Sequence, residues 1–455
     1  MSRLLLVATL LVATAIALPA TAQAGSRKTA ARTSQRGVPY ATDEAAMRWA
    51  DEVAQRRGLD VEWVRRAVGR AQLLPTVARL MQPAPPGTAK NWRVYRSRFI
   101  DPVRIAAGVK FWQDNQAVLE RAQQQYGVPP DIIVGIIGVE TIYGQQMGTF
   151  RVVDALATLA FNFPQGHPRA AERSAYFRGE LEQFLVLQAK AQSDPLEPLG
   201  SYAGAMGMTQ FMPSSWARWA VDFDGDGRID LARSAADAIG SVAHYFASYG
   251  WQPGMPTHYP VRFDPARLDK DALLAPDILP TFSVASFTAK GALLDGAALQ
   301  HKGPLALVEL QNGDDAPQYV AGTDNFYVIT RYNWSSYYAM AVIELGNEVK
   351  NVLQAQAVQL APADEMPAPV VNVPALPAAS APAAVEPAVP VPASAPLTAE
   401  PAAAPPANEP ADGEAAVPAP VSMPRASESP LPAAESPAVS PSAAPPTPAA
   451  SEPSR

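Results

Sequence analysis

Glu140 is the side chain in this sequence whose position is best suited to acid–base chemistry. It closes an apolar segment, 131–140, that is rich in Ile, Val and Gly, and Thr141-Ile-Tyr-Gly144 follows at once. Desolvation by the Ile and Val side chains and the partial negative charge at a helix C-terminus would both raise the pKa of this carboxyl group. A carboxylic acid that stays protonated near neutral pH can protonate the leaving oxygen of a glycosidic bond. For an isolated Glu, a core ion pair with an Arg is the alternative.

A second group of chemically useful side chains lies in the segment 200–215, which reads Gly-Ser-Tyr-Ala-Gly-Ala-Met-Gly-Met-Thr-Gln-Phe-Met-Pro-Ser-Ser. Its small residues let the backbone approach a ligand closely. Ser201, Tyr202 and Gln210 offer hydroxyl and amide groups that suit sugars. A tight crossing of two helices lined by small residues is an equally good interpretation of this segment taken alone.

Three carboxylates follow the spacing of an EF-hand calcium loop. Asp222, Asp224 and Asp226 occupy the first, third and fifth positions of the loop, and a glycine occupies the sixth. Arg233 stands where the loop normally ends in a bidentate Glu, and Asp237 is the candidate to replace that ligand. The flexible oxygen ligands favour Ca²⁺ over Mg²⁺, so we predict a structural calcium site; a solvated turn is the alternative.

Aromatic residues gather on both sides of residues 252–331. Tyr245 and Trp251 precede this stretch, and Tyr332-Asn-Trp-Ser-Ser-Tyr-Tyr338 follows it. Aromatic faces with polar tips suit carbohydrate rings, although tyrosines at helical spacing are more often core residues. The four histidines show neither metal-ligand spacing nor a Ser-His-Asp arrangement, and we expect no cofactor for catalysis.

Composition separates the two ends of the chain from its middle. Residues 361–455 hold 25 of the 47 prolines together with ten acidic and two basic residues, and we expect them to form a disordered tail. The tail therefore accounts for the net charge of −7, because residues 25–360 carry 33 charges of each sign. A globular part without basic excess gives no indication of nucleic acid as a partner.

The N-terminus has the pattern of a secretory signal peptide. Arg3 is followed by an apolar run from Leu4 to Leu18 and then by an Ala-x-Ala ending at Ala24, which predicts cleavage there. A membrane anchor is the weaker alternative, because the run is short and interrupted by Thr. The sequence contains no cysteine, so it has no thiol for a lipid anchor, and we expect an exported periplasmic protein.

The middle of the chain has an α-rich pattern up to about residue 250. Helices are predicted to begin at Thr42 and to cover 60–70, 91–100, 102–125, 131–140, 152–160 and 173–190. After Trp251, apolar runs punctuated by Pro predict short strands at 259–263, 281–284, 305–310 and 325–330. A helix over 336–353 is expected to follow.

Taken in order, these motifs closely resemble the membrane-bound lytic murein transglycosylase B family over roughly residues 40–355. The residues that carry the resemblance are 140–144, 201–207, 210–215, the loop from Asp222, and 331–342. The resemblance implies a mainly α (α+β) fold, with a lysozyme-like core, a helical domain and a small β-rich subdomain. It also implies cleavage of the MurNAc-GlcNAc bond of peptidoglycan without water, leaving a 1,6-anhydroMurNAc end.

The predicted organisation follows from the resemblance and the composition together. It comprises a signal peptide (1–24), a disordered segment (25–39), a catalytic region (40–360) and the tail (361–455). Within the catalytic region, the helical and lysozyme-like core covers about 40–250, the β-rich insertion about 252–331 and the closing helix about 336–353.

The resemblance also assigns site residues. It implies that Glu140 acts first as acid and then as base. It places glycan contacts on Ser201, Gln210, Tyr245, Tyr332, Tyr338 and Arg173, and calcium ligands on Asp222, Asp224, Asp226, Arg228 through its carbonyl, and Asp237. Arg173 is matched after extra residues at 165–171, and the stretch before Asp237 is one residue longer than is usual in the family.

The expected partner is a peptidoglycan glycan strand, with no nucleic acid and no membrane anchor; proteins of cell-wall synthesis or remodelling are left open as partners. Two other functions are weighed. A muramidase would hydrolyse the same bond and would need a second carboxylate facing the site. A non-catalytic glycan-binding protein would not need Glu140.

Overall fold

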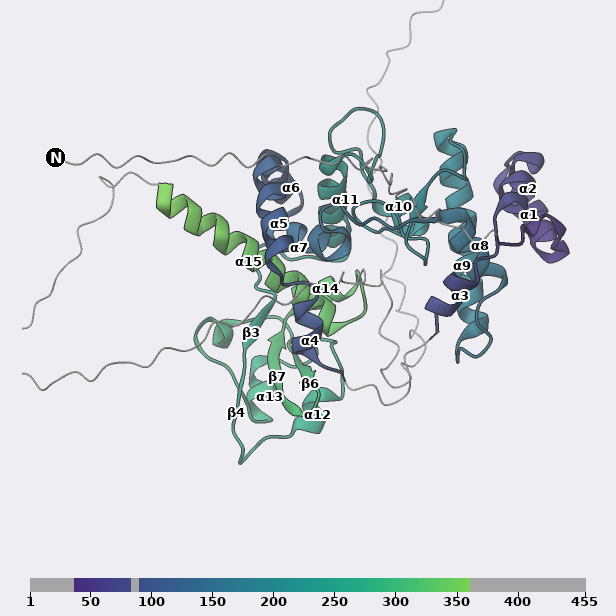
Figure 1. The fold of residues 1–455 in the computed structure, drawn as a ribbon. Helices are drawn as coiled ribbons and strands as arrows, with labels where there is room; N and C mark the ends of the chain where they lie inside the picture. Colours follow the sequence, from purple (N-terminus) through teal and green to yellow (C-terminus); the bar gives the residue numbers. More distant parts are fainter. Residues whose placement is uncertain (1–36, 83–89, 361–455) are drawn as a thin grey trace, which may run out of the picture. The chain divides into compact units, whose positions relative to one another are not determined.

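The computed structural model describes residues 37–82 and 90–360, which are mainly helical (Figure 1). The predicted signal peptide, residues 25–36 of the predicted disordered segment and the predicted tail lie outside the described residues. The helices are α1 (Glu44–Arg57), α2 (Val61–Arg70), α3 (Pro75–Leu80), α4 (Trp92–Ser97), α5 (Pro102–Asp114), α6 (Gln116–Tyr126), α7 (Pro130–Thr141), α8 (Val152–Phe161), α9 (Ala170–Ala191), α10 (Pro213–Trp219), α11 (Ala235–Ser248), α12 (Lys270–Leu274), α13 (Val284–Ala289), α14 (Asp324–Thr330) and α15 (Ser336–Leu360), with 3-10 helices at Tyr40–Thr42 and Gly296–Gln300.

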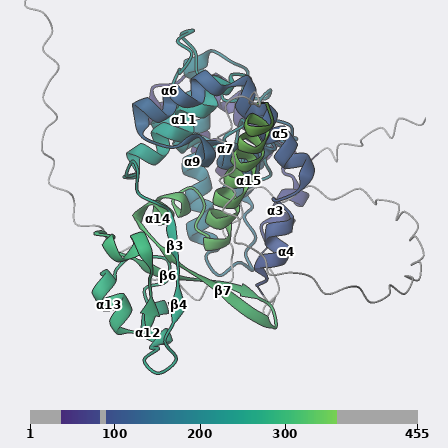
Figure 2. The same cartoon turned by 90° about the vertical axis from the view of Figure 1, so that its left-hand side faces the viewer.

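The strands of the described residues form small antiparallel sheets. β1 (Phe150–Arg151) pairs with β2 (Leu199–Gly200), and β4 (Arg262–Phe263) pairs with β5 (Ala292–Leu293). The third sheet has the order β3 (His258–Pro260), β7 (Asp315–Gly322), β6 (Ala306–Asn312). Figure 2 shows α12 and α13 beside this sheet.

Buried apolar side chains form three clusters. The first cluster surrounds α7 and takes side chains from α5, α6, α11, α14, α15 and β6. The second cluster is built by α1, α2, α3, α8 and α9. The third cluster lies between α12, α13 and the strands. Alternation along β6 joins two of them, because Val308 packs into the first cluster and Leu307 into the third.

Side chains of the segment 200–211 pack into two of these clusters. Its residues Tyr202 and Met206 pack into the second cluster, whereas Met208 and Phe211 pack into the first. Trp216, on α10 just after this segment, packs partly buried against both clusters. The segment therefore bridges the two largest cores of the described chain.

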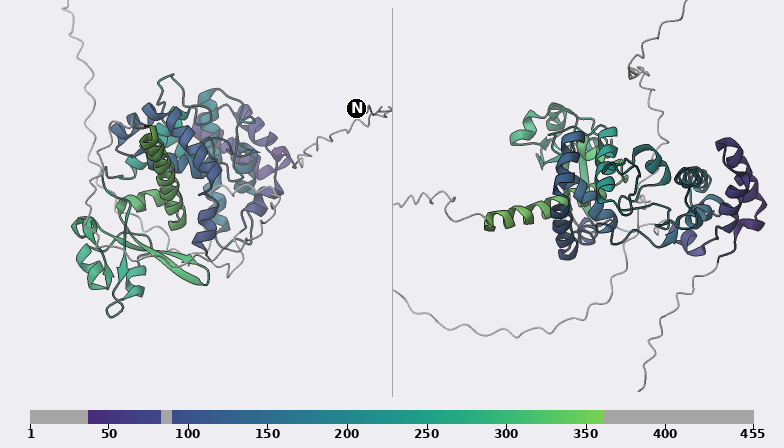
Figure 3. Two further views of the ribbon diagram at one scale, coloured as in Figure 1. Left: turned by 60° about the vertical axis from the view of Figure 1, so that its left-hand side comes forward. Right: turned by 90° about the horizontal axis from the view of Figure 1, so that it is seen from above.

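Helices α7 and α15 cross at unusually close range, because glycines lie at the crossing. A Cβ on Gly135 of α7 would lie 2.2 Å from the carbonyl oxygen of Val342, and one on Gly346 of α15 would lie 2.0 Å from that of Asp131. Glycine inside a helix costs about 0.5–1 kcal/mol relative to alanine, and here the missing side chains allow backbone contact. The crossing brings the first residues of α15 to the C-terminal end of α7. The far end of α15 extends beyond its neighbours (Figure 3), and its residues 354–359 are exposed.

The predicted strand at 325–330 is wrong, because these residues form α14. The Thr323 hydroxyl accepts the main-chain N–H of Asn325 and caps the helix, and Phe326 and Ile329, three residues apart, both enter the first cluster. The β-branched residues of this segment favour a strand locally, and tertiary packing overrides that preference.

Three further differences have local causes. Residues 281–284 form a single bridge, between Phe282 and Leu305, before α13 begins. The predicted helix 102–125 is divided at Asn115, whose side chain donates to the carbonyl of Phe111. Strand β7 was not predicted, although Asn312-Gly313 is a typical hairpin dipeptide and Gly313 has a φ of 64°.

No helix within residues 37–82 and 90–360 has both the length and the apolarity needed to cross a bilayer.

Candidate active site

Glu140 lies in the last turn of α7, where the backbone changes direction. The helix buries every residue from Ile132 to Val139, whereas Glu140 itself is half-buried. After Thr141, three successive residues adopt left-handed conformations: Ile142 (φ 49°), Tyr143 (φ 56°) and Gly144 (φ 87°). A β-branched residue in this region is a genuine outlier, so the packing around the turn must hold it in place.

The side chain of Thr141 connects this turn to the segment 200–211. Its hydroxyl donates to the carbonyl oxygen of Met208 over 2.9 Å and accepts the N–H of Gly144 over 3.0 Å. Thr141 is buried, with 1% of its surface exposed. The carboxyl-bearing end of α7 is therefore tied to the segment that contains Gln210.

A buried tyrosine holds the Glu140 carboxyl group. The Tyr338 hydroxyl, in the first turn of α15, donates to Oε1 of Glu140 over 2.5 Å. Burial raises the pKa of Tyr338 well above its usual value, and the negative charge of Glu140 raises it further. The phenol therefore keeps its proton and remains a hydrogen-bond donor across the physiological pH range.

Two more tyrosines continue from Tyr338. The rings of Tyr332 and Tyr338 stack with centroids 6.4 Å apart, and the ring of Tyr245 lies 4.9 Å from that of Tyr332. The Tyr332 hydroxyl donates to the carbonyl of Thr209 over 2.6 Å, and the Tyr245 hydroxyl donates to that of Arg331 over 2.5 Å. The hydroxyl groups of Tyr332 and Tyr245 are thus hydrogen-bonded to main-chain carbonyls, and the rings of the three tyrosines form a wall.

The segment 200–211 is a compact turn stabilised by its own polar groups. The Ser201 hydroxyl accepts the N–H groups of Ala203 and Ala205, over 3.3 and 3.0 Å. Gln210, with a φ of 50°, donates its side-chain amide to the carbonyl of Gly207 over 2.9 Å. Ser201 and Gln210 are both buried, so each helps to shape the turn.

A cavity of about 210 Å³ lies against this turn. It brings together four of the predicted glycan-binding residues: Arg173, Gln210, Tyr245 and Tyr332. The other lining residues are Tyr176, Phe177, Ala203, Ala205, Phe211, Met212, Ser215, Asn333 and Trp334. Ser201, Tyr338 and Glu140 do not line it, but Tyr332 joins the cavity to the Glu140–Tyr338 pair.

Two aromatic residues of this cavity, Tyr176 and Trp334, were not among the predicted site residues, although Trp334 lies in the aromatic stretch 332–338. Tyr176 on α9 is 43% exposed, and the guanidinium of Arg173 lies 5.6 Å from the centre of its ring. Trp334 lies two residues after Tyr332 and is half-buried. The helical spacing of Tyr176 and Phe177 fits core residues equally well, so it does not indicate a binding site. Trp334 could have been assigned, because it lies two residues after the predicted site residue Tyr332.

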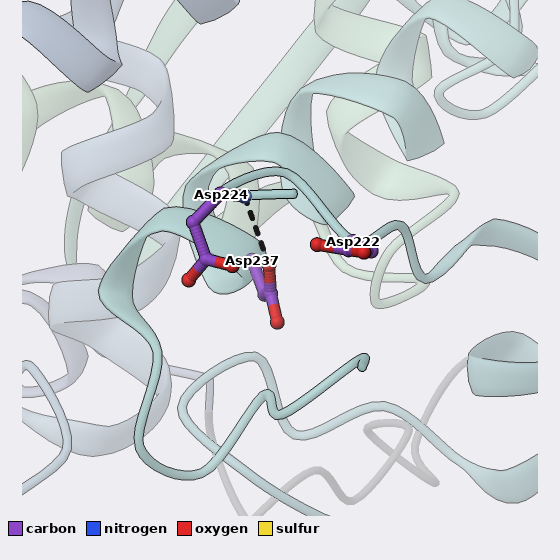
Figure 4. A group of neighbouring side chains, drawn as sticks. All are labelled: Asp222, Asp224 and Asp237. Atoms are coloured by element: carbon purple, nitrogen blue, oxygen red, sulfur yellow. Dashed lines mark hydrogen bonds between the residues drawn. The ribbon is translucent and has the colours of Figure 1, made fainter. Parts of the chain in front are cut away.

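The predicted calcium loop brings together three of the predicted ligands, Asp222, Asp224 and Asp237 (Figure 4). One carboxylate oxygen from each lies within 4.8 Å of the others. Asp237, in the first turn of α11, is buried, and its Oδ1 accepts the N–H of Phe223 over 2.7 Å. An all-oxygen set of three carboxylates fits a hard cation, which would relieve their mutual repulsion. Asp226 does not join this group; its Oδ1 accepts the N–H of Arg228 over 2.8 Å.

Hydrogen bonds inside the loop orient these carboxylates. The Ser234 hydroxyl donates to Asp224 over 2.6 Å and is the main reason that the pKa of Asp224 is lowered. Two backbone N–H groups, from Gly225 and Gly227, donate to Asp222.

Comparison with known proteins gives the family of the chain. The family model "Transglycosylase SLT domain" matches residues 42–347. The membrane-bound lytic murein transglycosylase B of Escherichia coli (strain K12) is 41% identical over 331 residues, which cover 69% of this chain and 85% of that protein.

Solved structures of related enzymes match the fold as well. The Escherichia coli lytic transglycosylase Slt35 in complex with bulgecin A has a TM-score of 0.62, and its complex with calcium has a TM-score of 0.60; each is 41% identical and covers 70% of this chain and 96% of Slt35. SltB3 from Pseudomonas aeruginosa in complex with NAG-anhNAM-pentapeptide is 29% identical, with a TM-score of 0.56, and covers 67% of this chain and 79% of SltB3. The chain therefore belongs to the lytic murein transglycosylase B family, with its lysozyme-like, mainly helical fold, and is a lytic murein transglycosylase.

Proposed function

We propose that Glu140 is the single acid–base residue of a peptidoglycan lytic transglycosylase. As acid, its carboxyl group gives its proton to the glycosidic oxygen between MurNAc and GlcNAc, and the bond from that oxygen to the anomeric carbon breaks. As base, the resulting carboxylate takes the proton of the MurNAc 6-hydroxyl while that oxygen bonds to the anomeric carbon. The carboxyl group ends as it began, no water is consumed, and the product is a 1,6-anhydroMurNAc end.

The observation that carries this proposal is the hydrogen bond from the Tyr338 hydroxyl to Glu140 Oε1. It fixes one oxygen of the carboxyl group, and we propose that the other oxygen, Oε2, exchanges the proton with the sugar. Held in this way, the carboxyl group can serve both proton transfers without changing its orientation. Tyr338 is then a positioning residue, and a direct glycan contact by its hydroxyl is not part of the proposal.

The similarity to lytic transglycosylases supports a lyase over a muramidase. Hydrolysis would need a second carboxylate beside Glu140 to act as a base or a nucleophile. Glu180, on the same helix as Tyr176, is buried, and its two oxygens accept hydrogen bonds from the N–H and hydroxyl of Ser214. It is therefore committed to holding α10.

We assign glycan binding to the cavity beside Gln210. Tyr176 and Trp334 offer aromatic faces, and Arg173, Gln210 and Asn333 offer polar groups, which together suit hydroxyl-rich rings. The complex of SltB3 with NAG-anhNAM-pentapeptide supports a peptidoglycan fragment as the ligand.

We propose that Asp222, Asp224 and Asp237 hold a structural Ca²⁺, with Asp226 and the carbonyl of Arg228 as further ligands. The calcium complex of Slt35 and the all-oxygen group support this assignment. When bound, the ion would order the loop before α11, and we assign it no part in the reaction.

We also propose that the protein is exported to the periplasm. The support is the signal-peptide pattern of residues 1–24. An N-terminus at residue 25 in protein purified from the cell envelope is expected. An uncleaved chain or a purely cytosolic one would contradict this location.

Product analysis of Glu140→Gln on purified sacculi tests the main proposal. The wild type is expected to release 1,6-anhydro products, whereas Glu140→Gln should bind sacculi, keep its melting temperature and release none. Glu120→Gln, at an exposed position on α6, is the matched control and should behave as wild type. Turnover by Glu140→Gln would refute the assignment of the residue, and products heavier by one water would establish a muramidase.

A further inference from the structure

A second and larger cavity, of about 630 Å³, lies between α2 and the C-terminal end of α9. One wall is a single face of α2 and the residues before it, where Asp60, Trp63, Arg66 and Arg70 follow one another at helical spacing. The opposite wall comes from the residues around the end of α9: Gln188, Ala189, Gln192, Ser193, Asp194, Pro195 and Leu196. No residue is shared with the cavity beside Gln210.

Local hydrogen bonds fix the walls of this cavity. Asp60 caps α2 by accepting the N–H of Trp63 over 2.6 Å, and Asp194 accepts the N–H of Leu196 over 2.9 Å. The Ser193 hydroxyl donates to the Gln188 side chain over 2.6 Å. The cavity therefore has defined walls, and it lies on the surface of the second hydrophobic cluster.

Three strong donors in the cavity have no partner among the residues that the structure describes. Within residues 37–82 and 90–360, the guanidinium groups of Arg66 and Arg70 form no ion pair, and the indole N–H of Trp63 donates no hydrogen bond. By contrast, Arg65 on the neighbouring face of α2 pairs with Asp51 over 2.7 Å. The two arginines of the cavity are exposed, and Trp63 is half-buried.

The chemistry of this lining suits a sugar. Trp63 gives an aromatic face, the arginines donate, and the carboxylates of Asp60 and Asp194 and the amides of Gln188 and Gln192 accept hydrogen bonds. The charges of the two acidic and two basic side chains cancel. The lining therefore suits a ligand that forms many hydrogen bonds better than one that carries a net charge. Sugar hydroxyls both donate and accept, and a sugar ring has an apolar face that packs on indole.

We propose that this cavity is a second glycan-binding site, which holds a sugar ring of a peptidoglycan strand on Trp63 away from the point of cleavage. The proposal rests on the proposed function only in the identity of the polymer. Helix α9 contributes to both cavities, and Arg173 and Gln188 are separated by about 23 Å along its axis, given 1.5 Å per residue. A polymer held at two places dissociates more slowly than one held at a single place, because release of one contact leaves the other.

The test compares polymeric with short substrates. Arg66→Gln/Arg70→Gln and Trp63→Ala are expected to weaken binding to peptide-free glycan strands about tenfold, and to lower the rate on intact sacculi by a similar factor. Turnover of a soluble tetrasaccharide should be unchanged, because so short a substrate does not occupy both cavities at once. Arg79→Gln, at an exposed arginine on α3, and Val61→Ala, at an exposed residue of α2, are the matched controls.

Binding is measured in the Glu140→Gln background, so the result is independent of turnover. Unchanged binding by the arginine pair, which is exposed and should not alter the fold, would overturn the proposal. An equal loss of turnover on the tetrasaccharide would assign the effect to the first cavity and would also overturn it. If the variants lose affinity only for strands that carry stem peptides, the site binds peptide and the glycan assignment is wrong.

Discussion

Gly135 of α7 lies against the carbonyl oxygen of Val342 on α15, so close that a methyl group in its place would approach that oxygen to 2.2 Å. The two helices carry the two partners of the hydrogen bond at the site, Glu140 near the end of α7 and Tyr338 near the start of α15. The interhelical distance therefore sets whether the tyrosine reaches the carboxyl group.

Gly135→Ala is expected to destabilise the protein by about 1–3 kcal/mol, because the added methyl group meets backbone and not a flexible side chain. It should also lower kcat, since α15 must move away from α7 and carry Tyr338 with it. Melting temperature and turnover on sacculi provide the two measurements. Gly179→Ala, at a helical glycine of α9 where a Cβ meets nothing within 4 Å, is the control. A Gly135→Ala protein of normal stability and activity would contradict the importance of the crossing.

Tyr338→Phe is expected to lower kcat by roughly 10- to 100-fold, because a hydrogen bond to a charged group contributes about 1.5–3 kcal/mol and each 1.4 kcal/mol changes a rate tenfold. KM should change little, because Tyr338 does not line the glycan cavity. Steady-state kinetics on a soluble tetrasaccharide separate the two constants.

Tyr319→Phe provides a matched control for that variant. Its hydroxyl donates to Glu309 over 2.6 Å in the β6–β7 hairpin, so the same kind of bond is removed away from Glu140. A rise in KM at constant kcat for Tyr338→Phe would instead indicate that the hydroxyl contacts the substrate.

Stability is expected to fall above about pH 10. Burial, with a further contribution from the charge of Glu140, raises the pKa values of Tyr332 and Tyr338 well above the usual 10.0. The folded state then holds these protons more tightly than the unfolded state, so their contribution is complete below pH 10.0 and is lost as the pH rises towards the folded-state pKa. Melting temperatures between pH 8 and 11 measure the effect, and Tyr338→Phe should flatten the alkaline slope. A slope identical to that of the wild type would count against Tyr338 as a source.

Removal of calcium is expected to lower the melting temperature, and added Ca²⁺ should restore it. An ion present at 100 times its dissociation constant stabilises the folded state by about 2.7 kcal/mol. Asp237→Asn should abolish the response to EDTA, whereas Asp295→Asn, at an exposed residue that pairs with Arg262, should keep it. If chelation leaves the wild-type melting temperature unchanged, the loop is a turn without an ion.

Local signals allowed part of this architecture to be predicted from the sequence. The end of the helix at Glu140 and the grouping of Asp222 with Asp224 depend on neighbouring residues. The structure ends α7 one residue later, at Thr141, and contains the carboxylate group. Asp237 also joins that group, although the intervening stretch is one residue longer than expected.

Contacts distant in sequence could not be predicted in the same way. The Tyr338–Glu140 bond spans 198 residues and depends on the glycines of two helices. The tyrosines were predicted as site residues, but packing decides whether a phenol faces a sugar or a carboxyl group. The helix at 324–330 was missed for the same reason, because its β-branched residues are held by the first cluster.

In the segment 200–211, Met206 packs into the second cluster and Met208 into the first. Trp216, which follows the segment, packs against both. Melting of either core would disrupt the cavity beside Gln210, because each core supports part of the same wall. Loss of activity and loss of structure should therefore coincide on heating, so a thermally damaged molecule cuts no further bonds. This enzyme degrades the cell wall, and the coupling means that only a fully folded molecule cleaves it.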